Sequence, residues 1–300
     1  MNNKLNKVRL KGNESFNIRE GWLRKGMRCV AEDPRLFAKR EAMELLGMGS
    51  KMVKSVRFWL QATGLTQEVY QNGGRVQTIT EDFGRVIDRY DPYFDDIFTL
   101  WLLHANIVAN EEFCIAWNIF FNEYEGENFT KEDLFLMCKA QLVKRMEEGA
   151  AFSEKSFYSD CASILKMYLS AETSEDPEES LGCPFAALGL IRRSANSKNA
   201  YRKVAPSPDQ LDKLAVLYVI RKNLAEGKRS VSIDDLLGAP NNVGKVFHLN
   251  RVGLNEYLDQ LRVSGLLTLT RTVGLDMVYL EDSPTPPEIM TAYYEKATVR

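Results

Sequence analysis

Residues 45–65, LLGMGSKMVKSVRFWLQATGL, combine a helical pattern of apolar residues with turn residues at both ends. One face of the predicted helix is apolar and consists of Val53, Val56 and Leu60. Ser50 predicts an N-cap, and Gly64 predicts the helix end. The pattern suits an ordinary buried helix as well as the DNA-contacting helix of a helix-turn-helix, so the flanking segments must decide.

The flanking segments predict a winged helix-turn-helix. Two shorter helices are expected before residue 50, at 19–31 and 39–46, and two strands after it, at 65–70 and 75–80. Asn72-Gly73-Gly74 between the strands is a hairpin signal. The order helix, helix, glycine turn, helix and hairpin is typical of a winged helix.

The last third of the chain repeats this pattern. When Gly64 is aligned with Gly265, the apolar face at Val53, Val56 and Leu60 aligns with a second apolar face at Leu254, Tyr257 and Leu261. Two strand-like runs follow Gly265 as well. The repeat predicts a second winged-helix-like domain.

We therefore expect a mainly α protein with small β hairpins, in which two winged helix-turn-helix domains flank a helical middle domain. The predicted boundaries are 1–90, 91–200 and 201–300. The middle segment contains long apolar helical stretches, and the Ser-, Asn- and Pro-rich stretch 194–209 predicts a linker.

The charge distribution favours a nucleic acid as the partner of the first segment. Residues 1–90 carry 17 Lys and Arg against 10 Asp and Glu, whereas residues 91–200 carry 9 against 19. A basic segment attracts polyanions. Local surface variation in a nearly neutral protein is the alternative explanation.

With one face in the core, helical geometry turns five side chains outward, Lys51, Lys54, Ser55, Phe58 and Gln61. We expect Lys51 and Lys54 to contact phosphates and Ser55 and Gln61 to reach base edges. Arg57 lies at the edge of this face, where it is either a DNA contact or part of an internal ion pair. Arg75 lies near the hairpin tip, where a wing contacts DNA. A role in packing or protein binding remains the alternative.

The second winged segment is a less basic candidate. Its outward set includes Asn250, Arg251 and Asn255 together with acidic residues. Acidic side chains facing phosphates weaken DNA binding, so this surface is a possible second site for either DNA or a protein partner.

The sequence offers little support for catalysis, and no catalytic residue, metal ligand set or cofactor is predicted. The chain has two histidines, and His104 lies within an apolar helix where a core role is expected. The acidic residues Asp91, Asp95 and Asp96 are interpreted as a helix-opening turn. Walker, GxGxxG and GxSxG motifs do not occur.

The cysteine pattern and the apolar runs favour the cytoplasm. Five cysteines are dispersed without a CxxC pair, as expected of reduced thiols. The polar start MNNKLNKVRLKGNES does not have the apolar core of a signal peptide, and the longest apolar runs are too short to span a bilayer. We expect no membrane partner, and the sequence does not indicate an oligomeric state.

Four blocks of the chain resemble a known family: GNESFNIREGWLRKG, LGMGSKMVKSVRFWLQATGL, DPYFDDIFTLWLLHANI and LGCPFAALGLI. The resemblance runs over residues 11–280 and is to a bacterial family of unknown function, number four thousand and seven in its series. The family's opening block often has a histidine where this chain has Asn13. A chemical role for that histidine would be lost here, whereas a structural role could pass to Asn13.

The resemblance implies a gene-cluster context rather than an activity. Proteins of this kind are similar to ones encoded beside PAPS-reductase-like sulfurtransferases in DNA phosphorothioation and phage-defence clusters. We therefore expect a non-catalytic component that binds duplex DNA and a protein partner. The alternatives are an adaptor that docks a sulfurtransferase-like or ATPase partner and, less favoured, a metal-dependent nuclease subunit.

Overall fold

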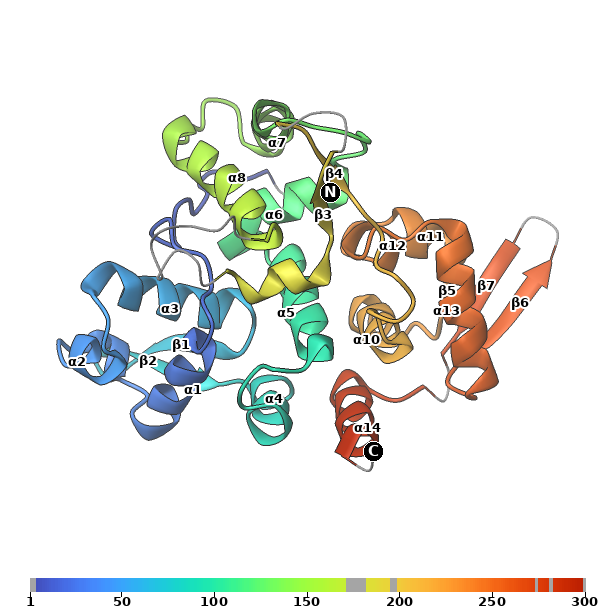
Figure 1. Cartoon of the computed structure of the whole chain (residues 1–300), viewed down its shortest axis with the longest axis horizontal. Coiled ribbons are helices and arrows are strands. Elements are labelled where there is room, and N and C mark those ends of the chain that lie inside the picture. Colours follow the sequence, from blue (N-terminus) through green and yellow to red (C-terminus); the bar gives the residue numbers. More distant parts are fainter. Residues whose placement is uncertain (1–3, 171–181, 195–198, 273–274, 281–282, 299–300) are drawn as a thin grey trace.

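The computed structural model describes residues 4–170, 182–194, 199–272, 275–280 and 283–298 (Figure 1). Helices predominate in these ranges, and the strands form small antiparallel sheets of two or three strands. The expected mainly α fold with small hairpins is thus confirmed.

The first ninety residues contain the predicted elements in the predicted order. They are α1 (Trp22–Glu32), the short 3-10 helix η1 (Leu36–Ala38), α2 (Ala42–Leu46), α3 (Ser50–Ala62), β1 (Thr66–Gln71), β2 (Gly74–Ile79) and α4 (Gly84–Tyr90). The β1–β2 turn places Asn72 and Gly73 at φ 50° and 74°, as a tight hairpin requires. The N-cap of α3 is Gly49 rather than Ser50, which is already the first helical residue.

Two mostly buried helices form the centre of the middle segment. Its elements are α5 (Ile97–Ala109), α6 (Glu111–Glu123), α7 (Lys131–Arg145), α8 (Glu154–Tyr168), η2 (Pro184–Leu188), β3 (Ile191–Arg193) and β4 (Tyr201–Lys203). Residues 98–108 of α5 are buried on every side of the helix, which is possible because apolar side chains surround its whole circumference. The linker predicted at 194–209 is wrong in part, because β4 pairs with β3 and its Tyr201 also pairs with Phe129.

The last segment contains the predicted third helix and hairpin together with two unpredicted elements. Its elements are α10 (Lys213–Asn223), β5 (Ser230–Ser232), α11 (Ile233–Gly238), α12 (Val243–Val246), α13 (Arg251–Val263), β6 (Thr268–Thr272), β7 (Leu275–Tyr279) and α14 (Pro286–Thr298). The sheet order is β5-β7-β6, so β5 widens the hairpin to three strands. The chain ends near α4, since α14 packs against both α10 and α4 (Figure 1).

One continuous apolar core joins the three segments. Its buried side chains extend from Ile18 to Tyr294 along the sequence. The rings of Trp59 in α3 and Trp117 in α6 meet edge to face at 5.6 Å, and the core reaches α14 through Tyr294. The predicted boundaries at residues 90 and 200 therefore do not separate independent cores. None of the described helices is long and apolar enough to cross a membrane.

The close approach of α4 to the start of β1 gives a test of this packing. A Cβ atom at Gly84 would lie 2.2 Å from the carbonyl oxygen of Leu65 and 2.8 Å from a methyl group of Ile79. We expect Gly84→Ala to lower the free energy of unfolding by about 1–3 kcal/mol, measured by urea denaturation. Gly49→Ala is the matched control, because nothing lies within 4 Å of its added Cβ atom. Equal stability of the two variants would contradict this packing.

Candidate nucleic-acid interface and an adjoining cavity

The exposed part of α3 is its first turn. The preceding helix α2 ends at Gly47 with φ 64°, and the chain enters α3 through the extended Gly49. Lys51 and Lys54 are exposed on the first turn. The Lys54 ammonium lies 3.9 Å from a carboxylate oxygen of Glu14, and within the described residues Lys51 has no ion-pair partner. Both lysines are thus available to an anionic partner.

The N-terminal segment, residues 9–16, covers Ser55 and Phe58 on the face of α3 that the sequence predicts to point outward. The expectation that these two side chains are exposed is therefore wrong. Ser55 is fully buried, and its hydroxyl donates a hydrogen bond of 3.3 Å to the carbonyl oxygen of Phe16. Phe58 is 3% exposed and lies under Gly12, with the Arg9 guanidinium 5.5 Å from its ring centre. The Ser55 hydroxyl is therefore not available to a base edge.

Arg57 and Gln61 make internal contacts. The Arg57 guanidinium binds the Glu68 carboxylate of β1 with two hydrogen bonds, one of them 2.6 Å long from Nε. Gln61 donates through its side chain to the carbonyl oxygen of Arg57 at 3.2 Å. Of the two alternatives left open for Arg57, the structure has the internal ion pair.

Three side chains of the β1–β2 hairpin are exposed. The sequence predicts Arg75 as a DNA contact, and it does not mark Val69 or Tyr70. The Arg75 side chain is 61% exposed, with its Nε 3.8 Å from the carboxylate of Glu68. Its cross-strand neighbour Tyr70 is 76% exposed and Val69 is 50% exposed. An exposed aromatic at a hairpin tip is visible only once the register is known, which is why no sequence signal marked Tyr70.

The candidate residues of the last segment, at the start of α13, are bound to their own neighbours. Asn250 is the N-cap of α13 and accepts a hydrogen bond from the backbone N–H of Gly253. Arg251 pairs with Asp234 and Asp276, and Asn255 accepts a hydrogen bond from Arg271. These contacts neutralise the cations of this surface.

The segment that covers α3 is held by a buried carboxylate. Asp160 of α8 is 5% exposed and accepts hydrogen bonds of 2.9 and 3.2 Å from the backbone N–H of Lys11. Burial raises the pKa of Asp160 to about 7. Asn13 is 1% exposed and donates to the Ser163 hydroxyl at 3.3 Å. Asn13 therefore has a structural, hydrogen-bonding role.

His104 and the acidic turn at Asp91–Asp96 make structural hydrogen bonds. His104 is fully buried between the Tyr168 hydroxyl and the carbonyl oxygen of Val246, and burial lowers its pKa to about 4. The carboxylate of Asp91 accepts hydrogen bonds from the Asp95 and Asp96 backbone N–H groups and from a threonine hydroxyl. Asp96 is the N-cap of α5, so this turn has the structural role predicted for it.

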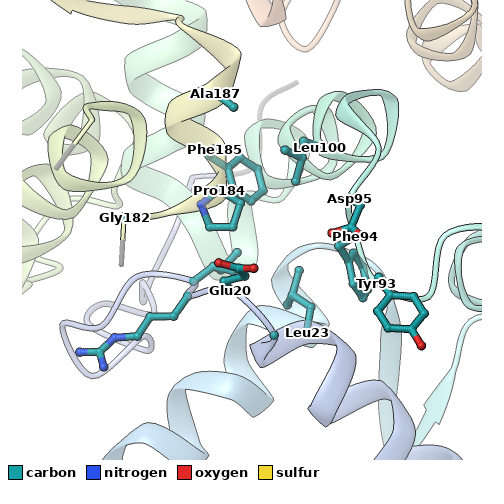
Figure 2. Close-up of a pocket in the computed structure, with 13 residues that line it drawn as sticks. Glu20, Leu23, Tyr93, Phe94, Asp95, Leu100, Gly182, Pro184, Phe185 and Ala187 are labelled. Atoms are coloured by element: carbon teal, nitrogen blue, oxygen red, sulfur yellow. The ribbon is translucent and has the colours of Figure 1, made fainter. Parts of the chain in front are cut away.

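A cavity of about 260 Å³ lies where the start of α1 meets the start of α5 and η2. Figure 2 shows Phe185 and Leu100 on one side of it and Leu23 on the other. Glu20 and Asp95 lie at different places around its opening (Figure 2). Its lining comes from three of the four sequence blocks that resemble the family, a convergence that the linear sequence could not reveal.

Comparison with known proteins identifies the family. The family described as "Protein of unknown function (DUF4007)" matches residues 10–294. This chain belongs to that family, as the sequence blocks indicated. No curated protein matches the chain.

Two solved structures share the fold of this family member. "SspB crystal structure" is 25% identical with a TM-score of 0.85, and "Magnesium ion-bound SspB crystal structure" is 24% identical with a TM-score of 0.86. Each comparison covers 98% of this chain and 90% of the solved one.

Within the described ranges, the side chains of this protein do not form a ready-made magnesium site. Mg²⁺ requires oxygen ligands in octahedral geometry. Throughout the described ranges, no three His, Cys, Asp or Glu side chains come together as a possible ligand set. Asp91 and Asp96 already accept backbone and hydroxyl hydrogen bonds, including one from Tyr293 to Asp96.

The buried Asp160 carboxyl gives this family member a defined pH dependence. The pKa of about 7 in the folded state exceeds the ordinary value of 3.8, so the folded protein binds more protons than the unfolded chain between these values. The contribution of Asp160 is therefore fully present below about pH 4 and is lost as the pH rises through 7. Relative to Asp160→Asn, we expect the wild-type free energy of unfolding to fall by up to about 4 kcal/mol over this range. Parallel pH dependences of the two proteins in urea denaturation would contradict this assignment.

Proposed function

We propose that this protein is a non-catalytic DNA-binding component of a DNA-modification or phage-defence system. Its first segment would act as a winged helix-turn-helix that holds duplex DNA. The observation that carries the proposal is the pair of exposed lysines, Lys51 and Lys54, on the first turn of α3. In helix-turn-helix proteins the N-terminal residues of this helix meet the major groove.

The burial of the rest of α3 supports a limited insertion into the groove. Because Ser55 and Phe58 lie under the N-terminal segment, contacts from this helix come from residues 50–54. Lysine contacts to phosphates position a protein on DNA but carry no sequence information. We therefore propose binding with little sequence preference through α3.

The β1–β2 hairpin would supply the second contact as a wing. Arg75 and Tyr70 are cross-strand neighbours, and both are well exposed. A cation beside an exposed ring suits a groove edge or the sugar-phosphate backbone. Arg57 would act indirectly, by holding Glu68 of β1 close to α3.

The biological setting of the proposal comes from the family resemblance. The sequence resemblance implies DNA phosphorothioation and phage-defence clusters, and the full-length similarity to SspB structures supports a component with the whole architecture of such proteins. Duplex DNA and a protein partner of the same system are the proposed partners.

Charge reversal of the first turn of α3 tests DNA binding. Mobility-shift titrations with duplex DNA at several salt concentrations should show weaker binding for Lys51→Glu/Lys54→Glu than for the wild type. The salt dependence of log K should become shallower by about one unit for each lost phosphate contact.

The matched control is Lys155→Glu/Lys166→Glu, which reverses two exposed lysines on α8. This control should bind like the wild type, because the same change in net charge is made away from the proposed interface. Equal loss in both variants, or no wild-type binding at low salt, would overturn the proposal.

The exposed face of α13 favours a second candidate function, that of a protein adaptor. Val252 and Val263 are 69% and 79% exposed on this helix, and the nearby Arg251 and Arg271 are paired with aspartates. Exposed valines beside arginines that are already paired with aspartates suit a protein partner better than a phosphate backbone. The sulfurtransferase-like or ATPase partner expected from the gene-cluster context is the proposed occupant.

Substitution on α13 tests the adaptor function separately. Val252→Asp/Val263→Asp should abolish co-purification with such a partner while leaving DNA binding unchanged, because both side chains are exposed and distant from the first segment in the fold (Figure 1). Capture of the partner by this variant at wild-type levels would exclude α13 as the docking helix.

A further inference from the structure

The short β3–β4 hairpin carries four cationic side chains among its six strand residues. The register of the two strands places Arg192 of β3 directly opposite Arg202 of β4. Residues opposite each other in an antiparallel pair have Cβ atoms about 5 Å apart on the same face of the sheet. The two guanidinium groups therefore extend from neighbouring positions on one surface.

Both arginines of this cross-strand pair are exposed and without a carboxylate partner. Arg192 and Arg202 are exposed, whereas Ile191 and Lys203, the adjacent pair on the opposite face, are buried. In the part of the chain that the structure describes, neither guanidinium makes a hydrogen bond, an ion pair or a ring contact. Like charges directly opposite each other destabilise a strand pair. The hairpin thus keeps a repulsive pair that a bound anion would relieve.

The buried face of the hairpin adds a further positive charge. Lys203 is 9% exposed, and its ammonium donates to the carbonyl oxygens of Phe120 and Tyr124 at the end of α6. Burial and the nearby Lys245 lower the pKa of Lys203 to about 8, so the side chain stays mostly protonated at pH 7. A charge beneath the sheet that has only neutral carbonyl partners strengthens the positive potential at the arginine pair.

Two guanidinium groups at this spacing suit a phosphate better than a carboxylate. A single guanidinium already satisfies a carboxylate with two parallel hydrogen bonds, because both oxygens of the carboxylate lie in one plane. The oxygens of a phosphate are arranged tetrahedrally, so that two guanidinium groups can donate to it from different directions. The arginine pair has the chemistry of a clamp for one phosphate group.

We propose that Arg192 and Arg202 clamp one phosphate of the DNA backbone, on an element separate from α3 (Figure 1). The cross-strand register and the exposure of two unpaired guanidinium groups carry this site. It deepens the proposed DNA-binding function and rests on it for the identity of the polyanion. Since phosphate contacts carry no base information, the clamp anchors the duplex without adding sequence preference.

Single and double substitutions test whether the two arginines share one phosphate. In mobility-shift titrations with duplex DNA, Arg192→Ala and Arg202→Ala should each weaken binding by about tenfold. The double variant should lose little more than either single one, because both side chains hold the same group. The slope of log K against log salt should become shallower by about one unit in all three variants.

The matched control is Lys155→Ala/Lys166→Ala, which removes two exposed charges from α8 and should bind like the wild type. Losses that simply add in the double variant would indicate diffuse attraction and overturn the clamp. Unchanged binding of wild-type strength in the double variant would overturn it as well.

Inorganic pyrophosphate tests the clamp without a duplex. In heteronuclear NMR of the full chain, the side-chain Nε–H signals of Arg192 and Arg202 should shift on titration with pyrophosphate. Arg229 is the internal control, because it is exposed but lies opposite Leu280 rather than a second arginine. Its signal should move much less than those of the pair.

The outcomes separate the clamp from the α3 interface. Lys51→Glu/Lys54→Glu should lose duplex DNA and keep the pyrophosphate shifts of the arginine pair. If these shifts occur while the wild type fails to bind duplex DNA, the proposed function fails and the phosphate site stands. Equal shifts of the pair and Arg229, no shift at all, or tighter binding of polyglutamate than of pyrophosphate would overturn the clamp.

Discussion

The carbonyl oxygen of Phe16 controls how much of α3 can meet a partner. It accepts hydrogen bonds from the Ser55 hydroxyl and, at 2.9 Å, from the Trp59 indole N–H, and thereby attaches the N-terminal segment along one face of the helix. The opposite face belongs to the core. Asp160 holds the same segment from α8 through the backbone of Lys11. Since both long faces are covered, any partner of α3 is restricted to its first turn, and the chemistry of that turn becomes decisive.

The sequence predicts which face of each helix or strand is buried by its own apolar pattern. It does not predict which of the remaining side chains another segment of the chain covers. Val56 and Leu60 are buried as their periodicity indicated, and the hairpin follows at the expected place. The helical pattern predicts that Ser55 is exposed, because this pattern contains no information about Phe16, which lies 39 positions earlier and accepts its hydrogen bond. The strand β5 and helix α14 were missed for related reasons. A three-residue strand has too few positions to show alternation, and α14 gains its order from packing on α10 and α4.

The two repeated segments differ in what they leave exposed. In the first, α3 is buried along most of its length, and its exposed lysines, Lys51 and Lys54, lie at one end. In the second, α13 has an open face along its whole length, yet Arg251 and Arg271 are paired with aspartates and Val263 is exposed. The two segments have similar helix and glycine patterns, yet the first exposes lysines and the second exposes a valine beside paired arginines. The difference supports a division of labour in which the first segment contacts an anion and the second contacts protein.

Helix α1 connects the cavity to the exposed first turn of α3. Its first residues border the cavity, and its later residue Cys29 shares a small apolar cluster with Val53 near the start of α3. Gly26 allows the close contact between them, because a Cβ atom there would lie 2.7 Å from Leu60. The packing of α1 on α3 therefore fixes the position of the cavity relative to the exposed lysines at the start of α3.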